Sequence, residues 1–258
     1  MTVLPVSVGV SADRTRVAFR LFHPKGNIIT AEMIHALRSA LETLAENPHL
    51  KLVTIEGHGD DFSFGASIAE HTREEIGRVL PAMRGLIDDL LSIAAPTAAV
   101  VRGRCLGGGF ELALACDLIF ASDDAVFGLP EIDLGVFPPI AAALLPLRVG
   151  AARATRTMLT GEVQPAADWR AAGLLELVTS RDQLERAVDE WFTRHLAPKS
   201  AAALRHAAIA ARVGLVAQAE STLPELERLY LDDLMRTLDA VEGVDAFLQK
   251  RPPIWKNR

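Results

Sequence analysis

The sequence predicts an α/β protein with a mostly parallel sheet, followed by a helical C-terminal region. Over the first half of the chain, short apolar runs alternate with helical patterns, which is typical of strands joined by crossover helices. From about residue 138 onward the pattern is helical. The chain has 258 residues, half of them hydrophobic, which is enough to bury a large core. We expect a core domain over 1–195 and a helical region over 196–258.

The first strands are indicated by β-rich runs at 3–10 and 16–22, with a turn at 11–13 between them. Thr30 then precedes a helical spacing of apolar residues that stops before Pro48. A buried strand follows over 50–56, which completes a β-α-β unit. These runs predict an opening hairpin joined to the start of a parallel sheet.

The middle of the chain continues the alternation. A looser segment over 57–71 leads to a helix that ends near residue 94, and an apolar strand over 97–102 runs into a glycine-rich segment at 103–109. A helix begins there. Two short strands are expected at 118–121 and 126–128, and helices at 138–149, 151–160, 165–171, 181–196, 200–218 and 221–250.

Composition excludes several classes of partner. The chain has 27 Lys and Arg against 33 Asp and Glu, and aromatic residues make up only 5%. It therefore lacks the basic field and the stacking platform that a nucleic acid needs. Because the sequence has no leader-like N-terminus and no apolar run of about 18 residues, we expect a cytoplasmic protein without a membrane partner.

The two cysteines, Cys105 and Cys116, fit neither a disulfide framework nor a zinc pattern. We expect both to be small buried side chains and no metal site to be present.

Three consecutive glycines, Gly107 to Gly109, stand between a buried strand and a helix. Glycine removes Cβ and permits positive φ, so this pattern indicates either a tight turn or a close approach of another group to the backbone. Leu112 occupies the third position that a dinucleotide fingerprint reserves for Gly or Ala, and no Lys-Ser/Thr pair completes a P-loop. The remaining interpretation is a helix N-terminus whose free amides stabilise a phosphate or an oxyanion.

Two glutamates lie near this segment. Glu111 falls in the first turn of the expected helix, where a carboxylate also complements the helix dipole. Glu131 follows 20 residues later and, taken alone, is typical of a solvated loop acid. If the two carboxylates meet in one pocket, their mutual repulsion separates their titrations and leaves one acid and one base. Such a pair suits proton transfer.

Three segments resemble the signatures of the enoyl-CoA hydratase/isomerase, or crotonase, superfamily. They are FSFGAS (62–67), RGRCLGGGFELALACD (102–117) and FGLPEIDLGV (127–136). LTG at 159–161 and the tail at 247–255 match the same family, so the resemblance covers essentially the whole chain. It implies a crotonase-like ββα superhelix with a C-terminal trimerisation region, and an assembly that is a homotrimer or a hexamer.

The resemblance also implies roles for individual residues. The backbone N–H groups of Ala66 and Gly108 would form an oxyanion hole for a thioester carbonyl, while Glu111 and Glu131 would hold and activate water. The substrate is an acyl-CoA thioester, and no metal or redox cofactor is implied. The residues expected to contact coenzyme A are Lys25, Ala66, Ile68 and Lys250, with Arg20 and Arg104 as the next candidates.

The sequence departs from many hydratases at two places. Ser67 stands where they have Asp, and AAALL at 141–145 replaces their Gly-Gly-Thr-Gln. The runs FGASIAEH (64–71), GVFPP (135–139) and LLP (144–146) are instead similar to hydratases of cyclohexa-1,5-dienecarbonyl-CoA. This similarity implies a lyase that adds water to a cyclic dienoyl-CoA. His71 is open to two interpretations, an acid/base or a residue at the surface or behind the reacting groups.

Three other functions compete with this one. A general 2-enoyl-CoA hydratase is the second choice and a double-bond isomerase the third. A non-catalytic protein that binds acyl-CoA or a partner comes from another class. The two glutamates argue against it, because a site without chemistry has no reason to keep two acids in an apolar pocket.

Overall fold

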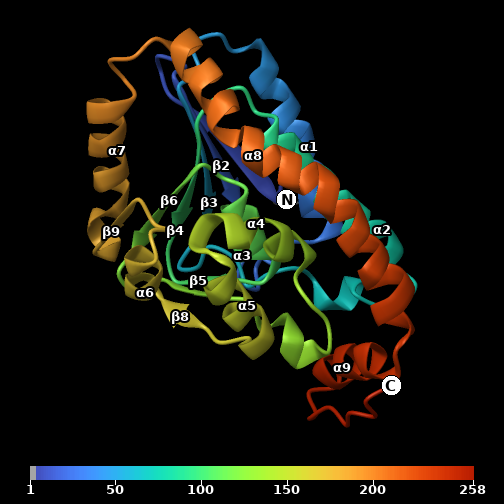
Figure 1. Cartoon of the computed structure of the whole chain (residues 1–258). Helices are drawn as coiled ribbons and strands as arrows, with labels where there is room; N and C mark the ends of the chain where they lie inside the picture. Colours follow the sequence, from blue (N-terminus) through green and yellow to red (C-terminus); the bar gives the residue numbers. More distant parts are fainter. Residues whose placement is uncertain (1–3) are drawn as a thin grey trace.

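The computed structural model describes residues 4–258 and builds the chain around a six-stranded sheet (Figure 1). The strand order is β1-β2-β3-β4-β6-β9, in which β1 is antiparallel to β2 and the other neighbours are parallel. The predicted mostly parallel sheet is therefore confirmed. Val3, where the first strand was expected to begin, lies outside the described residues. The strands are β1 (Val6–Val10), β2 (Arg16–Leu21), β3 (Leu52–Gly57), β4 (Thr97–Val101), β6 (Leu118–Ser122) and β9 (Leu177–Thr179).

A small second sheet lies beside the glycine-rich segment. Its central strand β7 (Val126–Gly128) is parallel to β5 (Arg104–Leu106) and antiparallel to β8 (Gln164–Pro165). The sequence indicated only β7. β5 lies within the segment interpreted as glycine-rich, and the two residues of β8 are too few to show a periodic pattern. The three glycines follow directly after β5 in the chain.

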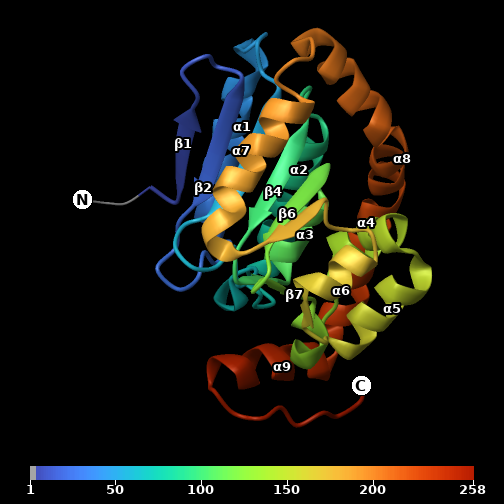
Figure 2. The same ribbon diagram turned by 90° about the vertical axis from the view of Figure 1, so that its left-hand side faces the viewer.

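Helices cover both faces of the main sheet, which explains why its central strands are apolar on both sides. Val53 and Ile55 of β3 face the core formed with α1 (Ala31–Glu42) and α2 (Ile76–Leu91). Leu52 packs against α7 (Leu184–His195) on the other side. Figure 2 shows α7 lying across the sheet. Thr30 caps α1 as expected, since its hydroxyl accepts a hydrogen bond from the backbone N–H of Met33 at 3.2 Å.

Four helices surround the second sheet and follow the predicted ranges closely. The buried indole of Trp169 meets the ring of Phe110 edge-on at 5.1 Å, and so fixes one helix of this group against another. The helices are α3 (Gly108–Leu114), α4 (Pro139–Val149), α5 (Ala151–Thr160) and α6 (Ala166–Ala171).

The C-terminal helices differ from the prediction. α8 (Ala201–Arg228) continues through the break expected near residue 220 and contains Pro224. The chain then passes through a π-helical turn, η5 (Leu229–Asp233), and the short η6 (Leu234–Arg236) before α9 (Leu238–Leu248). The expected helix over 221–250 is therefore wrong. Thr237 sets the real boundary, because its hydroxyl accepts a hydrogen bond from the backbone N–H of Ala240 at 3.1 Å.

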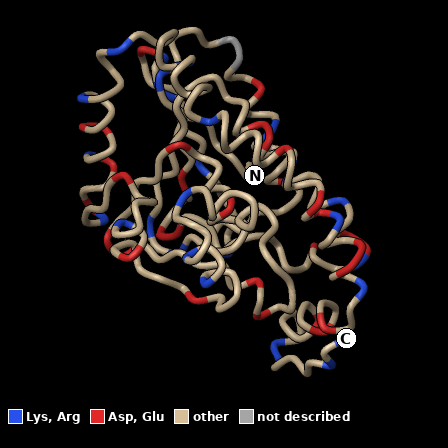
Figure 3. Tube along the Cα trace, in the orientation of Figure 1, with Lys and Arg blue, Asp and Glu red and all other residues tan. Residues whose placement is uncertain are grey.

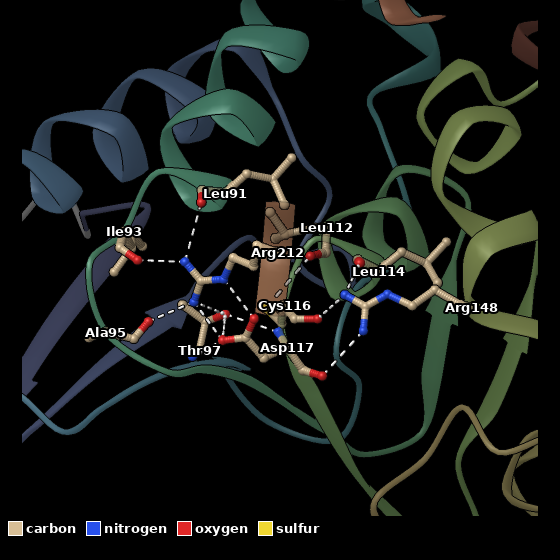
Figure 4. Close-up of polar contacts among 10 residues, drawn as sticks. All are labelled: Leu91, Ile93, Ala95, Thr97, Leu112, Leu114, Cys116, Asp117, Arg148 and Arg212. Carbon is tan, nitrogen blue, oxygen red and sulfur yellow. Dashed lines mark hydrogen bonds and ion pairs between the residues drawn. The ribbon is translucent and has the colours of Figure 1, made fainter. Parts of the chain in front are cut away.

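A buried arginine network joins α8 to the sheet (Figure 4). Arg212 is only 3% exposed, and its Nε lies 2.6 Å from Oδ1 of Asp117. Nη2 also donates to Oδ2 of Asp117, and the other guanidinium hydrogens reach the carbonyls of Leu91, Ile93 and Ala95. Hydrogen bonding on all sides offsets the cost of burying this charge.

A second arginine caps α3. Arg148 donates to the carbonyls of Leu114 and Cys116 at the C-terminal end of that helix, where the helix dipole favours a cation (Figure 4). Both cysteines are buried free thiols, as expected.

The C-terminal region packs on the core through α8, whose Ala219 and Leu223 are buried in the cluster that contains the sheet. The boundary expected after residue 195 coincides with the end of α7 and stays a prediction. None of the helices in residues 4–258 is long and apolar enough to cross a membrane. Lys and Arg are interspersed with Asp and Glu along the trace (Figure 3).

Candidate active site

The glycine-rich segment brings two distant parts of the chain into close contact. A Cβ on Gly109 would lie 2.6 Å from Cβ of Ser63, and one on Gly108 would lie 3.2 Å from the backbone nitrogen of Ala66. Side chains at these positions would therefore separate α3 from the 62–67 loop. The sequence-based interpretation of a close backbone approach is supported by this packing.

Two backbone amides are left free at this contact. Ala66 forms a parallel bridge with Ile29, in which Ile29 N donates to the Gly65 carbonyl and Ser67 N donates to the Ile29 carbonyl, each at 2.9 Å. In this pattern the N–H of Ala66 points away from Ile29. Within residues 4–258, neither this N–H nor that of Gly108 donates a hydrogen bond to another protein group. The pair is available to an anionic oxygen.

Glu111 projects from the first turn of α3 into the protein interior and is 5% exposed. Its Oε1 accepts a hydrogen bond from the backbone N–H of Ala141, in the first turn of α4, at 2.9 Å. Burial raises the pKa of Glu111, while hydrogen bonds from the amides of Ala141 and Ile140 favour its ionised form. The carboxylate is thus held by one oxygen and leaves the other for a ligand.

Glu131 lies in the 3₁₀ turn η3 (Pro130–Leu134), and its carboxyl group is placed above Gly107. A Cβ on Gly107, whose φ is +48°, would lie 2.7 Å from Oε1 of Glu131. The other oxygen, Oε2, is buried without a hydrogen-bond partner. Burial raises the pKa of Glu131, and the charge of Glu111 adds to the shift. The interpretation of Glu131 as a solvated loop acid is therefore wrong, whereas the predicted meeting of two carboxylates in one pocket is correct.

The two glutamates and the two free amides line one small cavity of about 40 Å³. That volume admits a water molecule, and the polar groups around it can bind one. Apart from His71 and Tyr230, the other residues in the walls are apolar. Besides Ala66, Gly108, Glu111 and Glu131, the lining residues are Ile34, His71, Ile76, Val79, Leu80, Met83, Phe137, Pro138, Pro139 and Tyr230.

The structure places His71, which is half-buried, in the wall of this cavity. Its Nδ1 lies 2.8 Å from the carbonyl oxygen of Ser67. A carbonyl oxygen can only accept, so Nδ1 carries the hydrogen. Burial lowers the pKa of His71, which favours the neutral ring with Nε2 as an acceptor.

A larger pocket of about 780 Å³ adjoins the cavity at Ala66, which lines both. Its walls come from the 23–30 segment, the 64–69 loop, η3 and α9, and they include Lys25 and Ile68. Lys250 is exposed and does not line the pocket, whereas its neighbour Arg251 does. Ala66 therefore lies where the small cavity meets the larger pocket.

The two reserve candidates lie outside both pockets. Arg20 forms an ion pair with Glu56, with Nη2 and Oε1 2.9 Å apart, and Arg104 stacks over the ring of Phe64 at 5.1 Å. Both guanidinium groups are thus engaged with other side chains.

Comparison with known proteins identifies the family. A family model described as enoyl-CoA hydratase/isomerase matches residues 16–258. The chain belongs to this family. The expected crotonase-like fold and the expected hydratase-type enzyme are therefore confirmed.

This hydratase/isomerase family member has relatives that match it over nearly its whole length. It is 42% identical to the cyclohexa-1,5-dienecarbonyl-CoA hydratase of Thauera aromatica, over 98% of both chains. It is 29% identical to a probable enoyl-CoA hydratase of Bacillus subtilis, over 97% of this chain and 98% of that one. The crystal structure of an enoyl-CoA hydratase from Mycobacterium avium subsp. paratuberculosis matches with a TM-score of 0.87 and 31% identity, covering 99% of this chain and 100% of the other.

Proposed function

We propose that this enzyme adds water to cyclohexa-1,5-diene-1-carbonyl-CoA and forms 6-hydroxycyclohex-1-ene-1-carbonyl-CoA. The observation that carries the hydration chemistry is the pair of buried carboxyl groups beside two free backbone amides. The ring substrate is supported by the 42% identity to a hydratase of that name over 98% of both chains.

The proposed reaction is a conjugate addition. The water oxygen forms a bond to the β-carbon of the thioester, and the π electrons of that double bond move toward the carbonyl oxygen to give a dienolate. A proton then adds to the far end of the dienolate, and the remaining double bond shifts into conjugation with the carbonyl. One water is consumed and no electrons are exchanged, so the proposal includes no redox cofactor and no metal ion.

Glu111 and Glu131 have different environments, which assigns their roles in this proposal. The backbone N–H of Ala141 favours the ionised form of Glu111, so Glu111 takes the proton from water. Glu131 has a buried oxygen without a partner and is repelled by Glu111, so it holds a proton and donates it to the ring. Each turnover leaves the proton on the opposite carboxyl group, and exchange with solvent resets the pair.

The amides of Ala66 and Gly108 would stabilise the dienolate oxygen. They are fixed by packing and do not reorganise when negative charge develops, so losing one such donor costs about 3 kcal/mol in the transition state. Lys25 and Ile68 in the larger pocket would hold the coenzyme A portion, with Lys250, the neighbour of the lining residue Arg251, as a further cation. These contacts bind ground and transition states equally.

A second candidate is a general 2-enoyl-CoA hydratase. It is favoured by relatives named probable enoyl-CoA hydratase, among them the Bacillus subtilis protein at 29% identity. The same carboxyl pair and amides would serve it, with a single double bond in place of the ring diene.

A substrate comparison distinguishes the two candidates. Purified protein is mixed with cyclohexa-1,5-diene-1-carbonyl-CoA or with crotonyl-CoA, and loss of the conjugated thioester absorbance is followed while mass spectrometry detects the gain of one water. We expect kcat/KM for the ring substrate to exceed that for crotonyl-CoA by at least about a hundredfold. Faster hydration of crotonyl-CoA would replace the first candidate with the second.

A further inference from the structure

Tyr230, the single tyrosine of the chain, reaches the acid/base cavity from a part of the sequence that showed no catalytic pattern. It lies in the π-helical turn η5 between α8 and α9, a kind of turn that often occurs at functional sites. Its side chain is 2% exposed, and its ring meets that of Phe137 edge-on at 5.3 Å. Tyr230 lines the cavity together with Glu111 and Glu131.

Glu131 offers an unpaired oxygen to the same space. Its Oε2 is buried and has no partner in the protein, and it lines the cavity with Tyr230 and Glu111. Buried polar atoms are rarely left unpaired, because the loss of hydration is costly. A cavity of about 40 Å³ lined by Glu111, Glu131 and Tyr230 has the size and the polar partners that a bound water needs.

We propose that the Tyr230 hydroxyl is a third protein contact of the reacting water, beside Glu111 and Glu131. The inference rests on the proposed hydration. A phenol hydroxyl can both accept and donate, so it can take one hydrogen of the water while Glu111 takes the other. That arrangement leaves a water lone pair directed at the substrate. Tyr230 keeps its own proton throughout, so the balance of the reaction is unchanged.

The protonation of Tyr230 agrees with this role. Burial raises the pKa of its hydroxyl, and the charges of Glu131 and then Glu111 add to the shift. The phenol therefore stays neutral over the working range of the enzyme. The titratable groups that line the cavity with Tyr230 are Glu111, Glu131 and His71. Arg73 is bound to the carbonyl of Met235, in the short helix that follows η5.

The test uses Tyr230→Phe, which keeps the ring and its contact with Phe137 and removes only the hydroxyl. The variant loses a polar group that supports the ionised form of the two carboxyl groups. The fall of kcat/KM at low pH, the acid limb of its pH profile, should therefore move to higher pH by about half a unit or more. We expect kcat to fall about tenfold while KM stays within twofold, because the coenzyme A contacts are untouched. The matched packing control is Leu231→Ala, which disturbs the same apolar cluster without lining the cavity.

The position of the acid limb decides the outcome. A limb that moves in Tyr230→Phe and not in Leu231→Ala supports the proposal, and an unmoved limb in Tyr230→Phe overturns it whatever happens to kcat. The variants are measured with whichever conjugated thioester the wild-type protein hydrates. If the wild-type protein hydrates only crotonyl-CoA, the ring substrate is refuted and Tyr230 can still be tested. If the wild-type protein hydrates neither thioester, both proposals are overturned.

Discussion

A missing methyl group at Gly107 makes room for the Glu131 carboxyl group. The Cβ of any other residue would approach Oε1 of Glu131 to 2.7 Å, and the φ of +48° disfavours side chains in addition. Gly107 lies between β5 and α3, so η3 can approach this part of the backbone only because no side chain stands there. The placement of the proposed acid thus depends on the backbone beneath it.

Gly107→Ala is expected to lower kcat by at least about tenfold, because a displaced carboxyl group no longer reaches the substrate. Gly59→Ala is a matched control, since Gly59 also has a positive φ, +79°, but has no atom within 4 Å of an added Cβ. Both variants carry backbone strain of about 1 kcal/mol, seen as lower thermal stability. Equal kcat values for the two variants, measured by steady-state kinetics, would show that Gly107 does not position Glu131.

The raised pKa values of the two glutamates predict a displaced pH profile. Burial raises the pKa of Glu111 and that of Glu131, so ionisation of each is shifted above the ordinary glutamate value of about 4.3. Activity needs an ionised base and a protonated acid, so it should fall as pH drops through the lower macroscopic pKa of the pair and again as pH rises through the upper one. Stopped-flow kcat/KM over a pH series measures both limbs, and a level profile from about pH 4 to pH 10 would contradict the assignment.

Single residues were predictable to different degrees. Glu111 and Gly108 follow a buried strand and a glycine run, so their place at a helix start could be inferred from the sequence. Glu131 alone could not be distinguished from a solvated acid, because its burial depends on η3 folding against Gly107. Tyr230 gave no signal, since the π-helical turn that directs it into the cavity arises from packing between α8, α9 and the core.

Arg212 on α8 binds both Asp117, which directly precedes β6, and the segment after α2. Replacing it with leucine would leave Asp117 and three carbonyls without their cation. Breaking a buried pair by removing one partner costs about 3 kcal/mol or more, so Arg212→Leu should lower the free energy of unfolding by about that amount.

The matched control for Arg212→Leu is Arg228→Leu on the same helix. Arg228 is exposed, and its contact with Asp233 is 3.9 Å long, so its loss should change stability by less than about 0.5 kcal/mol. Urea denaturation followed by circular dichroism gives both values. Similar midpoints for the two variants would show that the network of Figure 4 contributes little to stability.

The longer strands and helices were predictable because their apolar spacing extends over five residues or more. β5, β8 and β9 have only two or three residues each, and their pairing is fixed by neighbours far away in the sequence. The error in the last third has a local cause. The sequence predicted a break near residue 220, yet α8 runs through it because Leu223 and Ala219 are buried against the core.

Apolar side chains are exposed on α4, α5 and α8. They include Leu147, Leu159, Ile209 and Val213, which are between 48% and 69% exposed. Surfaces of this kind often mark contacts between subunits. We therefore keep the expectation of a homotrimer or a hexamer, which multi-angle light scattering can measure. A species of one chain mass, 27.8 kDa, at micromolar concentration would contradict it.

The most direct measurement is the turnover of Glu111→Gln and Glu131→Gln with the thioester that the wild-type protein hydrates. Each substitution keeps the shape of the side chain and removes a proton donor or acceptor, so kcat should fall at least about a hundredfold while circular dichroism stays unchanged. Glu162→Gln, at an exposed ion pair with Arg156, is the matched control and should retain wild-type turnover. Wild-type turnover in either cavity variant would contradict the proposed two-carboxylate mechanism.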